Sequence, residues 1–503
     1  MSGVSIHRVE ALEDNLLALM QKVAAYTDSP ASRRLVEVLP STGVSSGDTA
    51  FMMNCTAIVL MMTVPALGLY YSGMVNVKNV LATCMQSFAI TCLVTFLWMC
   101  LGYSLAFGPP GAPGELRHSS LFIGDSSRFW YWGIGANSVH QLAPTIPESV
   151  FATYQLTFAI ITAALICGAF ADRIKFSSLL VFITIWHLLV YCPIAHSIWH
   201  PDGFLYQEGL MDFAGGNVVH IASGMAGLMA TIVIGNRKGF GRHRFDPHNI
   251  LLTFIGASLL WVGWFGFNAG SNNAANARAG MAGLNTQIAT SMAAMTWMIT
   301  EWIIFKKPSV LGMLSGAVAG LVAITPACGW VDQTGAFFIG FLAGPWCFAC
   351  ARIKNYAGYD DALDAFGVHA TGGLLGGILT GFFAAPTFFG PYAPSHNVDS
   401  AGIYYPGVFY AIDKVNEDVQ LGKQAYGVFV TIFYAGGASL IIVKALDLTI
   451  GLRVTEDEEL AGLDESLHGE SIIGGGRKVP IHDRDSIREE HSQLVTPNEK
   501  QEI

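Results

Sequence analysis

Long apolar runs divide most of the chain into segments of membrane-spanning length. A helix needs about 20 apolar residues to cross the hydrocarbon core of a bilayer. Eleven runs approach that length, at residues 49–72, 80–107, 148–171, 176–196, 212–235, 249–270, 282–305, 309–325, 333–353, 366–385 and 425–447. The pattern predicts an all-α membrane protein, with a membrane domain over residues 49–447, an amino-terminal segment over 1–48 and a polar tail over 448–503.

Basic residues in the connections predict how this domain is oriented. One set of alternate connections carries eleven Lys and Arg residues and the other set carries five. Cytoplasmic connections are the more basic ones in membrane proteins, and an odd number of spans places the two ends of the domain on opposite sides. We therefore expect an extracellular amino terminus, a cytoplasmic tail and a location in the plasma membrane. No signal peptide is expected, because no apolar stretch precedes residue 49.

The two end segments differ in pattern. Apolar residues recur at intervals of three and four near the amino terminus, at Val9, Leu12, Leu16, Leu19, Val23 and Tyr26. This heptad spacing predicts either an amphipathic helix lying on the protein or the membrane, or a helix that packs against a neighbouring subunit. The tail has no spanning run, and the composition of its distal part is typical of disorder.

Composition narrows the classes of function. The chain is 52% hydrophobic and 13% charged, and much of its net charge of −10 comes from the tail, so nucleic acid is not an expected partner. No P-loop or dinucleotide-binding fingerprint occurs, which argues against phosphate-driven transport. The nine cysteines lie in or beside apolar runs, which favours packing over disulfides or metal binding, including at the CxxC of Cys347 and Cys350.

One polar pair occurs twice inside the apolar pattern. "MDFAGGNVVHIASGMAG" contains Asp212 and His220, and "DALDAFGVHATGGLLGG" contains Asp361 and His369, with the same spacing of eight in both. The pairs fall in the fifth and tenth predicted helices, which indicates a repeat of five helices that is inverted in the membrane, followed by an eleventh helix. Symmetry would bring both histidines to a shared central site, and the Gly, Ala and Ser residues around them allow close helix packing.

Two adjacent imidazoles suit two kinds of chemistry. They can line a pore and pass hydrogen bonds or protons, or they can act as the two axial ligands of a haem. A site for a bare metal ion would normally need a third or fourth ligand, and none is evident in register. The aspartates are expected to cap the two helices. For Asp212 a second interpretation stays open, in which the carboxylate also favours positive charge nearby.

Several motifs together resemble the ammonium transporter family, Amt/Mep/Rh, and its Amt/Mep branch in particular. They are "GLYYSGMVNVKN" (68–79), "GYSLAFG" (102–108), "GAFADRIKFSS" (168–178), "DFAGGNVVHI" (212–221), "GWFGFNAGS" (263–271), "ITPACGWV" (324–331) and "DALDAFGVHATGG" (361–373). The resemblance implies a homotrimer of eleven-helix subunits in membrane lipid, each with its own pore. It implies a transporter rather than an enzyme, and no cofactor or metal.

The resemblance also implies roles for individual residues. It places an outer site that recruits ammonium at Phe158, Trp199 and Ser271, with Asp212 close by and Tyr154 and Gln155 at the outer vestibule. Phe158 and Phe267 would form a paired phenyl gate, and Trp264, His220 and His369 would line the pore below it. Ammonium would lose a proton near the gate and pass as NH3, because a bare cation is far more costly in an apolar pore. Methylammonium is a candidate second substrate.

The tail segment "GLRVTEDEELAGLDESLHGES" resembles the regulatory segment of the same family. Ser466 aligns with a position that is phosphorylated in plant relatives, so a kinase or regulatory protein is a candidate partner. A phosphate would add nearly two negative charges there, although a solvated serine is an equally good interpretation. Two alternative functions stay open at this stage: an ammonium sensor that conducts little, and a bis-histidine membrane haem protein.

Overall fold

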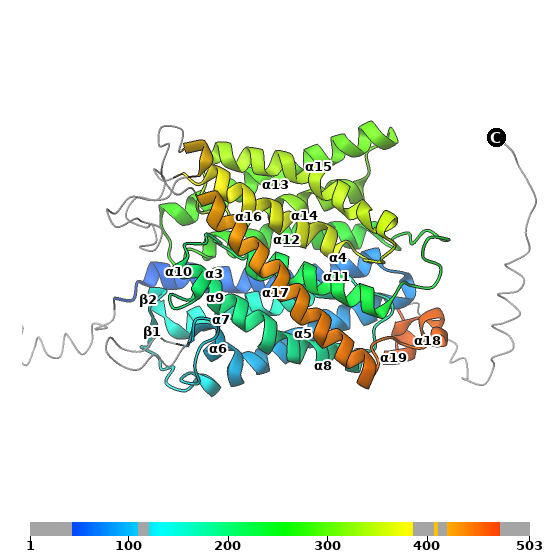
Figure 1. The fold of residues 1–503 in the computed structure, drawn as a ribbon, viewed down its shortest axis with the longest axis horizontal. Helices are drawn as coiled ribbons and strands as arrows, with labels where there is room; N and C mark the ends of the chain where they lie inside the picture. Colours follow the sequence, from blue (N-terminus) through cyan, green and yellow to red (C-terminus); the bar gives the residue numbers. More distant parts are fainter. Residues whose placement is uncertain (1–42, 109–119, 386–406, 411–419, 473–503) are drawn as a thin grey trace, which may run out of the picture.

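The computed structural model describes residues 43–108, 120–385, 407–410 and 420–472. The heptad segment at residues 9–26 and the distal tail beyond residue 472 lie outside the described residues. Within them, the chain folds into a bundle of long helices that run roughly side by side (Figure 1). One short two-stranded antiparallel ribbon, β1 (Val139–His140) with β2 (Ala143–Pro147), covers one end of the bundle.

The described helices are interrupted by short stretches of tighter or wider turns. The α-helices are α3 (Ser46–Met61), α4 (Gly68–Met74), α5 (Val80–Leu97), α6 (Tyr103–Phe107), α7 (Glu148–Ile166), α8 (Phe176–Trp186), α9 (Cys192–Trp199), α10 (Phe204–Gln207), α11 (Ala222–Ile234), α12 (Ile250–Gly270), α13 (Ala277–Phe305), α14 (Val310–Ile324), α15 (Gln333–Ala357), α16 (Thr371–Phe383), α17 (Gln420–Thr449), α18 (Glu456–Ala461) and α19 (Leu463–His468). The π-helical turns are η1 (Met62–Leu67), η3 (Trp98–Gly102), η5 (His187–Tyr191), η6 (Gly216–Ile221) and η7 (Ala365–Ala370), and the 3-10 turns are η2 (Val77–Asn79), η4 (Phe129–Tyr131) and η11 (Val408–Tyr410).

Ten helical segments among the described residues are long and apolar enough to span a membrane. Each corresponds to one of the eleven predicted runs, since α-helices joined by a π turn form one continuous span. The remaining run is α14, which has 15 residues. A helix of that length rises about 22 Å, which is less than the ~30 Å hydrocarbon core. Length and composition therefore support ten spans and leave α14 as a shorter apolar helix.

The two described ends of the chain lie at opposite ends of the bundle. The start of α3 lies at the end that carries β1 and β2, here called the ribbon end (Figure 1). The last helix of the bundle, α17, runs diagonally to the other end, where α18 and α19 lie; this is called the tail end below (Figure 1).

The third predicted helix is shorter than its apolar run. The run was predicted to be helical over residues 148–171, but α7 ends at Ile166 and a series of turns follows. At this point the hydroxyl of Tyr71 donates to the carbonyl of Leu165 at 3.1 Å. A Cβ on Gly168 would lie 2.7 Å from the Tyr71 ring. The end of the helix is thus set by a tyrosine almost a hundred residues away, which an apolar pattern does not encode.

The first part of the tail is packed on the tail end of the bundle. The carboxylate of Asp464 accepts from the backbone N–H of Ala82 at 2.8 Å, and the backbone N–H of Leu463 donates to Asn79 at 2.8 Å. Arg453 forms an ion pair with the buried Glu459 at 2.7 Å. Residues 450–472 are therefore an ordered part of the folded chain, in contact with the first connection between spanning helices.

Candidate functional site

The two histidine segments have the same local structure. In each, a six-residue π turn that contains the histidine, η6 or η7, leads into a 13-residue α-helix, α11 or α16. Each π turn follows a residue in the left-handed region, Gly215 with φ 108° or Asp364 with φ 59°. Both histidines lie inside the π turn, whereas the apolar pattern placed His220 two turns into a regular helix. Wide π turns are frequently found at functional sites.

The aspartates cap these turns, so the fifth helix begins at Gly216 rather than at residue 212, whereas the tenth begins at Ala365, within one residue of its predicted start. The carboxylate of Asp212 accepts four backbone N–H groups, from residues 215 to 218, at 2.6–3.2 Å. Asp361 accepts three, from residues 365 to 367, at 2.8–3.3 Å. Because the first N–H groups of a helix have no partner within it, a buried start needs such an acceptor. The helix therefore begins about four residues after each acid.

Glycine allows the two histidine segments to cross in close contact. The turn η6 packs against α16, and η7 packs against α11. Gly224 and Gly373 each lie four residues after a histidine. A Cβ on Gly224 would collide with the backbone nitrogen of Ala370, and a Cβ on Gly373 would lie 2.7 Å from the carbonyl oxygen of Gly216. The small residues noted in the sequence are thus required at these two crossing points.

The crossing brings the two imidazoles into direct contact. Nδ1 of His220 lies 3.3 Å from Nδ1 of His369, and the ring planes are 19° apart with centroids 5.4 Å apart. The indole of Trp264 covers the other side of His220, at 5.5 Å and 16°. Nε2 of His220 is buried and has no hydrogen-bond partner among the described residues. Because the two Nδ1 atoms share a hydrogen bond, the two Nε2 atoms remain available to a small molecule beside the pair.

This geometry does not fit a haem or a metal ion. Two axial bonds of about 2 Å each would place the ligand nitrogens about 4 Å apart on opposite sides of a macrocycle. Here the two Nδ1 atoms are in direct contact at 3.3 Å, which leaves no space for a porphyrin between them. Among the described residues no cluster of three or more His, Cys, Asp or Glu side chains could hold a metal.

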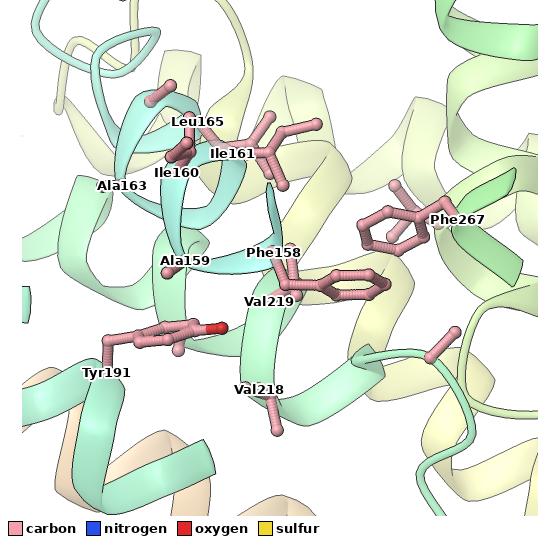
Figure 2. Packing of buried hydrophobic residues seen from close by; sticks show 14 of the residues in the cluster. Phe158, Ala159, Ile160, Ile161, Ala163, Leu165, Tyr191, Val218, Val219 and Phe267 are labelled. Atoms are coloured by element: carbon pink, nitrogen blue, oxygen red, sulfur yellow. The ribbon is translucent and has the colours of Figure 1, made fainter. Parts of the chain in front are cut away.

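Two phenylalanines lie next to the histidine pair. The rings of Phe158, on α7, and Phe267, on α12, stack at 4.2 Å with planes 17° apart, and they face one another in Figure 2. The ring of His220 lies 6.1 Å from that of Phe267. Both phenyl rings are buried. A continuous series of rings therefore leads from Phe158 through Phe267 and His220 to His369.

A cavity of about 210 Å³ lies on the other side of this phenyl pair, at the ribbon end. Five of the predicted site residues line it: Gln155, Phe158, Trp199, Asp212 and Ser271. The indole of Trp199 stands edge-on to Phe158, at 5.8 Å and 86°. The side-chain oxygen of Gln155 is buried without a partner among the described residues, so it is available as an acceptor. The cavity thus offers aromatic faces together with oxygen acceptors.

Tyr154 has a different position from the other predicted residues. It is not among the residues that line the cavity. Its hydroxyl donates to the carbonyl oxygens of Gly266 and Phe267, each at 2.9 Å, and lies 3.4 Å from Oγ of Ser271. Tyr154 therefore supports the segment that carries Phe267 and Ser271 from behind.

Several other cavity residues were not singled out from the sequence, among them Phe107, Phe213, Arg278 and Trp330. The ring of Phe107 is stacked on Trp199 at 6.4 Å and 14°. The guanidinium of Arg278 lies over the ring of Trp330 at 3.8 Å and near that of Phe213 at 4.9 Å. Phe107 lies in the quoted motif "GYSLAFG" and Trp330 in "ITPACGWV". The family motifs therefore contained both residues and could have identified them as candidate site residues.

The predicted regulatory serine lies on α19 at the tail end. Oγ of Ser466 donates to the carbonyl of Gly462 at 2.7 Å, and the side chain is partly buried. Acidic residues surround it along the same helix and its caps. The side chain is thus partly accessible on a short helix at the tail end.

A bundle of membrane-spanning helices, with a buried polar pair at a helix crossing and an aromatic cavity beside it, defines a multi-pass membrane protein built around an internal site. The profile of the Ammonium Transporter Family matches residues 50–472. The "Ammonium transporter" of Bacillus subtilis is 43% identical over 425 residues, covering 84% of this chain and 98% of that protein. The chain therefore belongs to the Ammonium Transporter Family.

Solved structures support the same assignment. The crystal structure of Saccharomyces cerevisiae Mep2 superimposes with a TM-score of 0.73 at 30% identity, covering 84% of this chain and 90% of that chain. A protein described as "Sensor Amt Protein" superimposes with a TM-score of 0.72 at 26% identity, covering 84% and 98%. The chain is thus similar both to proteins described as transporters and to a protein described as a sensor.

Proposed function

We propose that this protein carries ammonium across the plasma membrane. The observation that supports this most strongly is the continuous series from an aromatic cavity, through the stacked pair Phe158 and Phe267, to the contact between His220 and His369. Family membership and the names of the relatives point to the same substrate. Each part of the series matches one step in the handling of a small cation.

The cavity is suited to recruit NH4+. The cation has four N–H donors and no acceptor. The faces of Trp199 and Phe158 provide cation–π attraction, of about 0.5–2 kcal/mol each depending on desolvation, and Gln155 and Ser271 provide oxygen acceptors. The carboxylate of Asp212 lies in the cavity wall with its oxygens satisfied by backbone N–H groups. It therefore acts as a fixed negative charge and as a cap, which combines the two interpretations left open for it.

The stacked phenyl rings separate the cavity from the histidine pair. An ammonium ion that passed them intact would lose its hydration and its acceptors, at a cost of many kcal/mol, whereas neutral NH3 would lose far less. We propose that the proton is released near the gate and that NH3 moves past Trp264, His220 and His369. The unpartnered Nε2 of His220 offers a hydrogen-bonding atom on that route. Potassium has no proton to release, so this route would exclude it.

The proposed assembly follows the family. We propose a homotrimer in which each subunit has eleven helices, with α14 as the eighth, and in which the ribbon end faces outward and the tail end faces the cytoplasm. The two capped histidine turns support an inverted five-helix repeat, because η6 and η7 share one backbone plan and meet at their histidines. No cofactor takes part in this proposal, and methylammonium is the analogue to test.

The decisive experiment compares wild type with His220→Ala in oocytes, by recording inward current and pH change when ammonium is added, with potassium as the control ion. A saturable ammonium response that is lost or made unselective in the variant is expected. Acid–base change without current would indicate net conduction of NH3 rather than of NH4+.

The matched control is His248→Ala. The ring of His248 contacts the carbonyl of Val75 at 3.1 Å, before the start of α12, and is not part of the series. It should keep the wild-type response. Normal surface levels of the wild type with neither current nor pH change would contradict transport and favour the sensor alternative, in which ammonium is bound but little is conducted.

A phosphate at Ser466 is expected to reduce uptake. It would remove the hydrogen bond to Gly462 and place negative charge next to Glu465 and next to Asp464, whose carboxylate holds α19 at the tail end. Ser466→Asp should therefore lower methylammonium uptake at equal surface expression, while Ser466→Ala should not. Equal uptake by both variants would leave Ser466 as an ordinary surface serine without a regulatory role.

A further inference from the structure

Histidines hold the end of the short helix that carries Phe107. The carbonyl oxygen of Ala106 lies 3.1 Å from Nδ1 of His196, and that of Phe107 lies 3.0 Å from Nε2 of His140. These carbonyls are the last of α6, where a helix has free acceptors and a partial negative charge. Phe107 lines the cavity and stacks on Trp199. The histidines therefore fix the position of one aromatic wall of the proposed recruitment site.

His196 differs from His140 in what its two ring nitrogens contact. Nδ1 faces the carbonyl of Ala106 at 3.1 Å, and Nε2 faces the carbonyl of Ser120 at 2.9 Å. Carbonyl oxygens only accept hydrogen bonds, whereas a neutral imidazole has one N–H and one bare nitrogen. A neutral His196 would thus set a lone pair against a carbonyl oxygen in a buried position. Only the imidazolium, with two N–H groups, satisfies both contacts.

His140 shows the contrast with a neutral ring. Its Nε2 donates to Phe107, and its Nδ1 accepts from the backbone N–H of Leu142 at 3.2 Å. Burial lowers the pKa of His140 to about 4, with the Phe107 contact and Glu148 acting in the opposite direction and Arg128 in the same direction as burial. One donor and one acceptor suit a neutral imidazole, so the two histidines at the end of α6 are predicted to carry different charges.

The charged groups around His196 come from several elements. Burial opposes a positive charge on His196, whereas the two carbonyl contacts favour one, as do the carboxylates of Asp202, just after α9, and Asp125, in the connection after residue 120. The ring of His200 stacks on His196 at 4.4 Å and 16°, and its Nδ1 accepts from the backbone N–H of Asp202 at 3.1 Å. Farther away, Glu148 on α7 is neutralised by Arg128 at 2.9 Å, and His140 lies on β1. Among the described residues, two carbonyls and two carboxylates thus favour the cation, and burial and the adjacent His200 oppose it.

We propose that His196 is a proton-binding positioning residue, held as an imidazolium that ties the end of α6 to the residue-120 connection and so fixes Phe107 against Trp199. Loss of the second proton would break one of the two contacts and loosen the aromatic wall. The effect on recruitment rests on the proposed function, whereas the protonation state does not. His196 lies only three residues before Trp199 on α9, so the clamp acts on both stacked rings.

The protonation state is tested directly by ¹⁵N NMR of the full chain in lipid bilayers, with ¹⁵N-labelled histidine. The wild-type spectrum minus that of His196→Gln isolates the two ring nitrogens, and His196→Asn supplies the difference if the glutamine variant fails to accumulate. Two protonated nitrogens at pH 6 are expected. One protonated and one bare nitrogen at that pH would overturn the proposal, whether or not the protein transports ammonium.

The consequence for recruitment is tested by the KM for methylammonium at external pH between 5.5 and 7.5, where the substrate itself stays protonated. The wild-type KM should rise by about threefold or more as His196 loses its second proton. A threefold change corresponds to less free energy than the loss of a charge-assisted hydrogen bond can cost. In His196→Gln, KM should be raised already at low pH and nearly constant. His248→Gln, which removes a carbonyl-bonding histidine at the tail end, should follow the wild-type curve. Parallel curves for wild type and His196→Gln would overturn the coupling to the cavity.

Discussion

The segments around His220 and His369 share a backbone plan but not their surroundings. Both have a capping aspartate, a π turn, a histidine and a glycine four residues later. At the ribbon end, Asp212 lies in the wall of an aromatic cavity, and His220 is covered by Trp264. At the tail end, Asp361 lies beside Lys354, whose ammonium group contacts its carbonyl and the carboxylate of Asp364.

This difference distinguishes the features that any buried helix start requires from the features that are specific to the proposed ammonium site. The shared features satisfy backbone N–H groups and allow two helices to touch, and they would be needed at any such crossing. The features that are not shared are an aromatic cavity and a phenyl pair on one side, and a compensated acid on the other. Burial raises the pKa of Asp361 to about 6, with Lys354 opposing the shift and Asp364 adding to it.

The largest expected effect comes from removing the caps. Asp212→Ala would leave four backbone N–H groups without an acceptor, and Asp361→Ala would leave three. Each buried orphan costs about 1–3 kcal/mol, so both variants should lose several kcal/mol of folding free energy, and Asp212→Ala should lose more. Thermal unfolding in detergent, followed by size-exclusion chromatography, measures the order.

The corresponding asparagine variants sharpen this comparison. Asp212→Asn and Asp361→Asn keep one acceptor oxygen and should recover part of the lost stability. If Asp212→Asn is stable but transports poorly, the charge of Asp212 matters beyond its role as a cap. Equal stability of Asp212→Ala and wild type would contradict the capping account altogether.

A smaller effect is expected at the two crossing glycines. Gly224→Ala would force apart the contact with Ala370, and Gly373→Ala the contact with Gly216 and His220. Overpacking of this kind costs about 1–3 kcal/mol, so both variants should unfold earlier and lengthen the contact between the histidines. Gly437→Ala is the control, because a Cβ there meets nothing within 4 Å. It should be neutral or stabilising by about 0.5–1 kcal/mol, as expected for a glycine inside a helix.

The smallest effect is expected at Trp264, which only the His220 side possesses. Trp264→Leu removes the ring stacked on His220 and the hydrogen bond from Nε1 to Thr325 at 2.9 Å. An aromatic contact and a neutral hydrogen bond contribute about 1 kcal/mol each, so uptake of methylammonium should fall by about thirtyfold at most. Trp264→Phe, which keeps a ring, should lose less. Wild-type uptake by the leucine variant would show that the stacking of Trp264 on His220 does not contribute to transport.

The pattern of apolar runs predicted the helical membrane fold well but not the ends of its helices. Ten of the eleven runs correspond to described spans, and α14 is shorter than a bilayer requires. The helix over 148–171 was predicted too long because Tyr71 sets its end. Hydropathy measures whether a residue tolerates lipid or a core, and it does not register a hydrogen bond that stops a helix.

The candidate site was only partly accessible from sequence. The repeat of an acid and a histidine predicted that His220 and His369 would meet, and the structure brings them to 3.3 Å. The family resemblance predicted Phe158, Trp199 and Ser271, which line one cavity. Tyr154 was expected at the vestibule but lies behind it, and Phe107 was not singled out, because a motif identifies a residue without giving the direction of its side chain.

By itself, the sequence determined the number and order of apolar helices, the repeated spacing of eight between acid and histidine, and the small residues that permit a close crossing. These features depend on local periodicity and composition. Only the tertiary structure decided that both histidines lie in π turns, that Phe158 and Phe267 stack, and that His196 contacts two carbonyls. Such contacts join residues that are far apart in the chain, and their geometry is set by packing and by the need to satisfy buried polar groups, neither of which is a local property.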